Sequence, residues 1–155
     1  MARVKNKSSI HFYFKDVPPN LTARRKLKDF LIFLFKNEKK NLGELNYIFC
    51  TDKFLLKINQ DYLKRDYYTD VISFNLSSSS KEIVGEIYIS IPRVRENARY
   101  FKQRFSNELL RVVFHGALHL CGYEDETFTQ QSQMKKKEEN YLHQYFTQVP
   151  RRTVS

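Results

Sequence analysis

Residues 107–126 of the chain read NELLRVVFHGALHLCGYEDE, and the rest of the sequence is arranged around them. Their apolar side chains recur at helical spacing and predict a mostly buried helix, which Gly122 would end. His115 and His119 are four residues apart. On a helix they share one face, with Cβ atoms ~6 Å apart. The stretch therefore predicts a central helix whose two imidazoles can reach one metal ion.

An acidic run, residues 124–126, follows the glycine closely enough for a carboxylate to fold back over the two histidines. Two imidazoles and one carboxylate leave a coordination position open, which is typical of catalytic rather than structural zinc. The alternative is a pair of core histidines that hydrogen-bond locally, but the glycine and the acidic run favour the metal. A metallopeptidase of the HExxH kind needs glutamate after the first histidine, and this position is Gly116.

The composition predicts one domain, residues 1–155, long enough to bury a core. Two cysteines form no disulfide framework, the start lacks the apolar stretch of a signal peptide, and the longest apolar run, residues 30–35, is too short for a bilayer. We therefore expect a cytoplasmic protein with no membrane contact. An excess of 27 Lys and Arg over 17 Asp and Glu gives a net charge of +10, which favours a nucleic-acid partner.

The periodicity along the chain predicts an α+β fold in which a four-stranded mixed sheet packs with about five helices. The expected strands are 9–14, 45–49, 71–76 and 84–90, and the expected helices are 22–40, a short one capped by Thr51, one capped by Ser90, the histidine helix capped by Ser106, and 129–146. We expect right-handed crossovers at the first two connections and a hairpin between the last two strands. Residues 135–139, KKKEE, read as a solvated helix face, and 149–155 as a frayed tail.

Residues 115–123, HGALHLCGY, closely resemble the HGxLHLxGYDH signature of the YbeY family. Residues 69–74, TDVISF, are similar to the family's PTDVLSF segment, and residues 85–87, GEI, to its GDI. The resemblance covers most of the chain and implies a metal-dependent endoribonuclease specific for single strands. It further implies action in 16S rRNA 3′-end maturation and ribosome quality control, with zinc as cofactor. The implied partners are rRNA and the ribosome or its proteins, and no DNA is expected.

The chain departs from the family pattern at the third histidine, which falls on Asp125, with Glu124 and Glu126 as rivals. The resemblance thus implies the metal ligands His115, His119 and Asp125. A carboxylate lowers the Lewis acidity of the metal and widens the choice of metal toward manganese or iron.

The family's usual arginine falls on Leu63, which leaves Arg65 as the nearest substitute for holding a phosphate. Asp70, Glu86 and Glu124 are candidates for the general base, although Asp70 or Glu86 could instead orient a histidine.

Three other functions stay open. They are a non-catalytic RNA- or ribosome-binding module with a structural metal, a metal-dependent hydrolase of small substrates, and a folded domain without metal.

Overall fold

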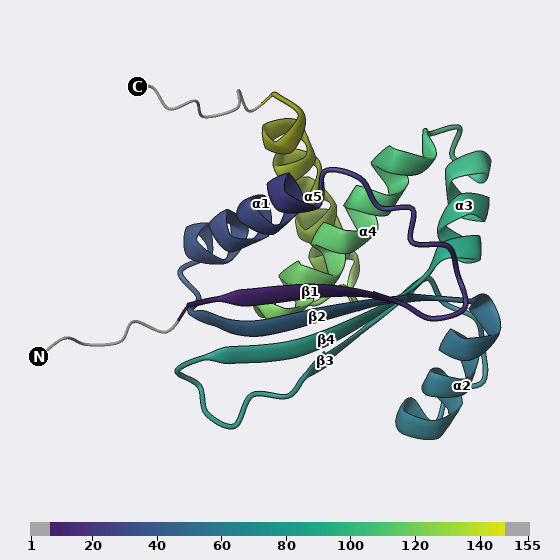
Figure 1. The fold of residues 1–155 in the computed structure, drawn as a ribbon, viewed down its shortest axis with the longest axis horizontal. Coiled ribbons are helices and arrows are strands. Elements are labelled where there is room, and N and C mark those ends of the chain that lie inside the picture. Colours follow the sequence, from purple (N-terminus) through teal and green to yellow (C-terminus); the bar gives the residue numbers. More distant parts are fainter. Residues whose placement is uncertain (1–6, 148–155) are drawn as a thin grey trace, which may run out of the picture.

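The computed structural model describes residues 7–147 and confirms the predicted α+β fold with a four-stranded mixed sheet and five helices (Figure 1). The elements are β1 (Ser9–Phe14), α1 (Arg24–Asn37), β2 (Leu42–Cys50), α2 (Asp52–Leu63), β3 (Val71–Asn75), β4 (Ile83–Ser90), α3 (Ile91–Tyr100), α4 (Phe105–Leu120) and α5 (Phe128–Thr147). The expected tail at 149–155 lies outside the described residues.

The strands are arranged in the order β1-β2-β4-β3. β1 and β4 both run parallel to β2, whereas β3 pairs antiparallel with β4, as the expected hairpin requires. The prediction of two successive crossovers was wrong at the second connection. The chain leaves β2 through α2, passes to the edge strand β3 and only then turns back into β4, so the parallel partner of β2 is β4.

One face of the sheet carries the main core, and α1, α4 and α5 lie together over it (Figure 1). The alternating residues Leu45, Tyr47 and Phe49 of β2 are fully buried there. Tyr47 donates a hydrogen bond from its hydroxyl to the carbonyl of Val113 at 2.8 Å, and burial raises the pKa of this tyrosine well above its usual value. This hydrogen bond fixes α4 against the sheet, in agreement with the predicted central buried helix.

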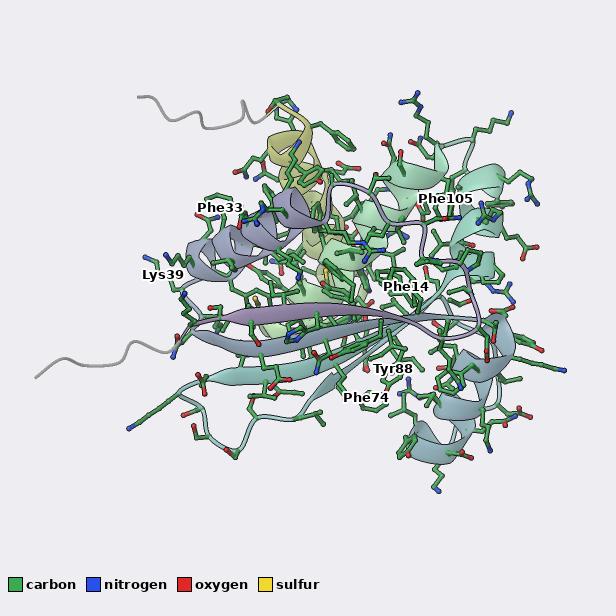
Figure 2. The ribbon with its side chains drawn as sticks, viewed as in Figure 1. Phe14, Phe33, Lys39, Phe74, Tyr88 and Phe105 are labelled. Atoms are coloured by element: carbon green, nitrogen blue, oxygen red, sulfur yellow. The ribbon has the colours of Figure 1, made fainter. Side chains whose placement is uncertain are left out.

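The other face of the sheet carries a smaller cluster around α2. Leu55 of α2 packs with Cys50 and Ile72, and the rings of Phe74 and Tyr88 meet edge to face at 5.8 Å (Figure 2). Side chains alternate across a strand, so the even-numbered residues of β3 and β4 face away from α4. This alternation decides the side of the sheet on which Glu86 lies.

Two of the three expected helix caps are confirmed. The side chains of Thr51 and Ser90 accept hydrogen bonds from the backbone N–H groups of Phe54 and Arg93. The Ser106 cap was wrong, because the N-cap is Arg104 and α4 begins at Phe105, two residues earlier than a helix capped by Ser106 would. Within residues 7–147, no helix combines the length and the apolar character needed to cross a bilayer.

Candidate metal centre

The two histidines lie on α4, at the border between its buried face and solvent. Their side chains are 16% and 29% exposed, and the two Nε2 atoms are 3.1 Å apart. His119 Nδ1 lies 2.9 Å from the carbonyl oxygen of Tyr123, and His115 Nδ1 contacts the carboxylate of Glu138. A carbonyl or carboxylate oxygen only accepts, so each Nδ1 carries the proton and each Nε2 presents a lone pair. Two such lone pairs at this distance favour a cation between them.

Asp125 completes the group from the loop that follows α4. Gly122, with a φ of 108°, ends the helix in a conformation that suits glycine and lets the chain turn back. One carboxylate oxygen of Asp125 then lies 3.3 Å from His115 Nε2 and 3.3 Å from His119 Nε2. Tetrahedral zinc with bonds of about 2.0–2.1 Å requires ligand atoms about 3.3 Å apart. The three residues therefore fit a metal ion with one position left open.

The rivals of Asp125 do not share this geometry. Among the described residues, His115, His119 and Asp125 form the one group of side chains spaced to hold a metal ion. Glu124 and Glu126 instead line the neighbouring cavity, called here the β3 cavity, whose volume is about 450 Å³. The remaining lining of the β3 cavity includes Asn59, Leu63, Arg65, Tyr67, Thr69, Asp70, Ser73, Asn75, His115, His119 and Asp125.

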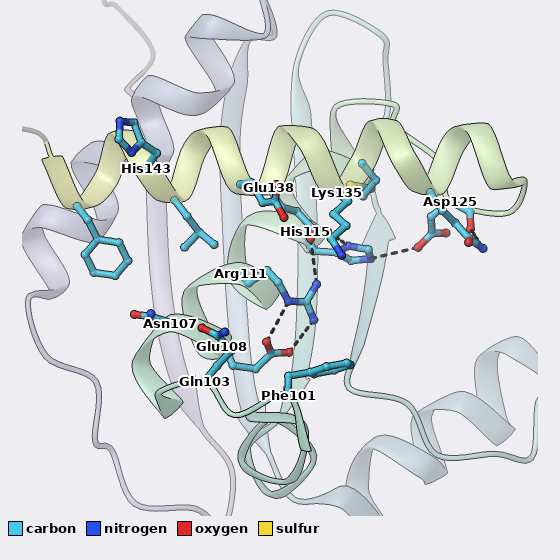
Figure 3. A pocket seen from close by; sticks show the side chains of 15 residues that line it. Phe101, Gln103, Asn107, Glu108, Arg111, His115, Asp125, Lys135, Glu138 and His143 are labelled. Atoms are coloured by element: carbon cyan, nitrogen blue, oxygen red, sulfur yellow. Dashed lines mark hydrogen bonds and ion pairs between the residues drawn. The ribbon is translucent and has the colours of Figure 1, made fainter. Parts of the chain in front are cut away.

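Glu138 of α5 is the residue behind His115, and sequence reasoning missed it. The residue is 3% exposed, and its carboxylate contacts both His115 Nδ1 and, at 3.0 Å, Arg111 Nη1 (Figure 3). A carboxylate in this position fixes the tautomer and orientation of a metal-binding histidine. The expectation of a solvated face at 135–139 was therefore wrong at Glu138. Met134 and Tyr141, four residues before and three after it, are buried on the same helix face and were the available signal.

Arg111 holds three carboxylates around this centre. It donates to Glu108, itself 3% exposed, at 2.6 and 3.1 Å, and to Glu138, and lies 3.9 Å from Asp70. Burial disfavours the charged guanidinium, but the hydrogen bonds and charges of Glu108 and Glu138 outweigh it and raise the pKa of Arg111. The guanidinium stays positive, and three carboxylates against one arginine leave an electrostatic environment that favours a cation.

Asp70 precedes β3 and lines the β3 cavity together with both histidines. Its side chain is 22% exposed and accepts a hydrogen bond from Asn97 at 3.2 Å. Burial raises the pKa of Asp70, and the charges of Arg111 and His115 oppose this only in part. Asp70 consequently takes up a proton more readily than an ordinary aspartate.

Arg65 lies on the rim of the β3 cavity, exposed to solvent. Its backbone N–H donates to the carbonyl of Asn59 at 3.1 Å, and the buried Asn59 side chain donates to the carbonyl of Tyr67 at 2.9 Å. These bonds fix the segment to the end of α2 and leave the guanidinium at the mouth of the cavity.

Glu86 is not brought to this site. It lies on the side of β4 that faces away from α4, where it accepts a hydrogen bond from the hydroxyl of Tyr88 at 2.9 Å. It lines neither the β3 cavity nor the second cavity beside the histidines. A direct role for Glu86 in chemistry at the histidines therefore has no support in the geometry.

The chain is similar to known proteins of one family. The family model described as Endoribonuclease YbeY matches residues 13–146. The chain is 42% identical over 134 residues to endoribonuclease YbeY of Cytophaga hutchinsonii. The matched region covers 86% of this chain and 94% of that protein. The chain is also 55% identical over 106 residues to endoribonuclease YbeY of Flavobacterium psychrophilum, a match that covers 68% of this chain and 75% of that protein.

A solved structure agrees with this likeness. The solution structure of a protein from Thermotoga maritima is similar with a TM-score of 0.54 and 29% identity, covering 88% of this chain and 89% of that one. The likeness thus extends over most of both chains. The chain belongs to the endoribonuclease YbeY family.

Proposed function

We propose that this chain is a metal-dependent endoribonuclease that cleaves single-stranded RNA at the centre formed by His115, His119 and Asp125. The observation that carries the proposal is the ligand triangle, with separations of 3.1, 3.3 and 3.3 Å, inside a member of a family of endoribonucleases. His115, His119 and Asp125 would hold a divalent metal, which would supply Lewis acidity toward a phosphoryl oxygen of the substrate. Zinc fits the nitrogen and oxygen donors, and the carboxylate also admits manganese or iron.

The chain's own residues supply the remaining parts. Glu138 keeps His115 in the tautomer whose Nε2 faces the centre. Asp70, with its raised pKa, takes the proton from the attacking oxygen, which is a water or the ribose 2′-hydroxyl. Arg65, at the mouth of the β3 cavity, holds a flanking phosphate.

The biological substrate is proposed from the family. We assign the chain to 16S rRNA 3′-end maturation and ribosome quality control in the cytoplasm, with the ribosome or its proteins as partners. The family match over residues 13–146 supports a single metallohydrolase domain for the whole chain, 1–155. The net charge of +10 supports an RNA substrate.

The test is cleavage of a short single-stranded RNA of defined sequence by purified protein, with and without a chelator. Wild type should cleave it, the chelator should stop cleavage, and His119→Ala should bind the RNA without cleaving it. His11→Ala, an exposed histidine of β1, is the matched control and should cleave normally. If His119→Ala cleaved at the wild-type rate, the enzymatic proposal would be wrong. Binding by wild type without cleavage would favour a non-catalytic RNA-binding module.

A further inference from the structure

A second cavity, next to the β3 cavity, also reaches the metal centre. It lies between α5 and the corner that joins α3 to α4, has a volume of about 730 Å³, and is called here the α5 cavity (Figure 3). His115 and Asp125 line both cavities. An RNA strand with one phosphate at the metal centre can therefore place its next nucleotide in the α5 cavity. Its volume lies within the range of about 300–1,000 Å³ usual for sites that bind small organic groups.

Exposed aromatic rings stand at the edges of the α5 cavity. Phe101, at the end of α3, is 56% exposed, and Phe146, near the end of α5, is 52% exposed. The Phe101 ring meets Tyr100 edge to face at 5.0 Å, which supports it on one side. Met134 and Leu142 are apolar members of the same lining. Flat exposed rings beside an apolar wall are the surface on which unpaired bases stack.

The polar part of the lining suits a neutral group better than a phosphate. Glu108 and Glu138 are already paired with Arg111, and the lining also contains Glu139 and Lys135, one further carboxylate and one further ammonium group. A phosphate would meet these carboxylates at close range. The amide side chains of Gln103 and Asn107 lie on the same wall, and amides both donate to and accept from base edges.

We propose that the α5 cavity is a nucleobase subsite, which takes an unpaired base of the RNA strand next to the phosphate at the metal centre. The inference rests on the proposed function and adds to it where the strand lies. Phe101 supplies the stacking surface, and Gln103 and Asn107 contact the edge of the base. An unpaired base can enter such a cavity, whereas a base within a duplex cannot, so the subsite explains a preference for single strands.

The test measures affinity for a fluorescein-labelled single-stranded RNA by anisotropy. All titrations use the His119→Ala background, which is expected not to cleave and whose altered residue does not line the α5 cavity. Phe101→Ala should weaken binding by about 5- to 150-fold, the usual loss when one stacked base is released. Phe101→Trp should retain affinity. Phe128→Ala is the matched control, because Phe128 is 83% exposed and lines neither cavity.

A series of RNAs, each with one abasic ribose, identifies the partner of Phe101. At one nucleotide position, removal of the base should weaken RNA binding by the protein that keeps Phe101. The same removal should not weaken RNA binding by the Phe101→Ala protein any further. Additive losses at every position would show that Phe101 contacts no base and would overturn the proposal. Equal losses for Phe101→Ala and Phe128→Ala would overturn it as well. RNA cleavage by wild type is assayed separately, so that failure of the subsite is distinguished from failure of the nuclease.

Discussion

His115 contacts Glu138 through Nδ1 and faces the metal centre with Nε2, and this makes Glu138 the most informative residue to change. Its carboxylate is buried, accepts from His115 Nδ1 and is neutralised by Arg111. Replacement by glutamine keeps the size of the side chain but removes the charge that favours the required tautomer. A carboxylate behind a histidine ligand is commonly worth about 10- to 100-fold in metal affinity.

We therefore expect Glu138→Gln to bind zinc or manganese about 10- to 100-fold more weakly than wild type, measured by competition with a chromophoric chelator. Glu139→Gln, at the exposed neighbouring position, should bind as wild type does. The thermal midpoints of both variants separate loss of metal from loss of fold. Unchanged metal affinity in Glu138→Gln would show that the carboxylate serves packing alone.

Helical spacing alone identified His115 and His119, because residues four apart share a face. The choice of Asp125 over its acidic neighbours required the family resemblance, since loop geometry is not readable from spacing. Glu138 was missed because it contacts His115 across 23 residues of chain and follows three lysines. The position of Glu86 was readable from the sequence, because Ile87 and Ile89 on β4 are buried and strand alternation sends Glu86 to the opposite face.

At the scale of elements, α4 lies so close to the sheet that one position tolerates no side chain. A Cβ at Gly116 would lie 2.8 Å from Ile87 Cγ2, and Ser73 Oγ already donates to the Gly116 carbonyl at 3.1 Å. Gly116 is flanked along α4 by His115 and Ala117, so displacement of the helix there moves the metal ligands.

Gly116→Ala should lower the free energy of unfolding, because overpacking costs about 1–3 kcal/mol while the gain in helix propensity is about 1 kcal/mol. Urea denaturation measures the difference. Ile87→Ala removes the atoms that clash, so the two substitutions together should cost less than the sum of their separate effects. The net loss should lie between about 0 and 2 kcal/mol, so a Gly116→Ala protein more stable than wild type would refute the close contact.

Glu38 joins the end of α1 to α5 and to the segment between α4 and Asp125. It accepts hydrogen bonds from Tyr123 at 2.8 Å and Lys137 at 3.1 Å, and a further one from Tyr141. Burial opposes ionisation of Glu38, but these hydrogen bonds outweigh it and lower its pKa below the ordinary value of 4.5. The ionised carboxylate therefore stabilises the folded state.

Glu38→Gln should lower the free energy of unfolding by about 1.5–3 kcal/mol at neutral pH, the usual range for hydrogen bonds to a charged group. Because the pKa is lowered by folding, this difference is fully present above the ordinary pKa of 4.5 and shrinks as pH falls through the folded value. Denaturation at several pH values measures it. Glu96→Gln, in an ion pair whose glutamate is 65% exposed, should change stability little, and a pH-independent effect of Glu38→Gln would contradict the account.

The elements themselves were largely readable from periodicity, since each of the four strands and five helices was expected near its observed place. Their order in the sheet was harder. The local sequence does not indicate whether β3 pairs with β2 or lies at the edge of the sheet. That depends on which of the two hairpin strands, β3 or β4, pairs with β2. The start of α4 was also not readable locally, since Arg104 is the N-cap and Phe105, partly buried against the core, already lies in the helix.

For the whole molecule, the net charge of +10 predicts strongly salt-dependent RNA binding. The logarithm of the association constant should fall linearly with the logarithm of salt concentration, with a slope of about −0.7 per phosphate neutralised on a single strand. Arg65→Ala should reduce the steepness by about 0.7 if Arg65 holds one phosphate, whereas Lys36→Ala, exposed on α1 and outside both cavities, should not. An unchanged slope in Arg65→Ala would remove Arg65 from the RNA contacts.

The claim on which the account depends most is that His115, His119 and Asp125 hold one metal ion together. Elemental mass spectrometry of protein purified without chelator tests it most directly, on wild type, His115→Ala, Asp125→Ala and, as the matched acidic control, Glu124→Gln. The account predicts near one metal equivalent in wild type and in Glu124→Gln, and loss from the other two. Wild type without metal, or Asp125→Ala with its full content, would contradict the proposed centre.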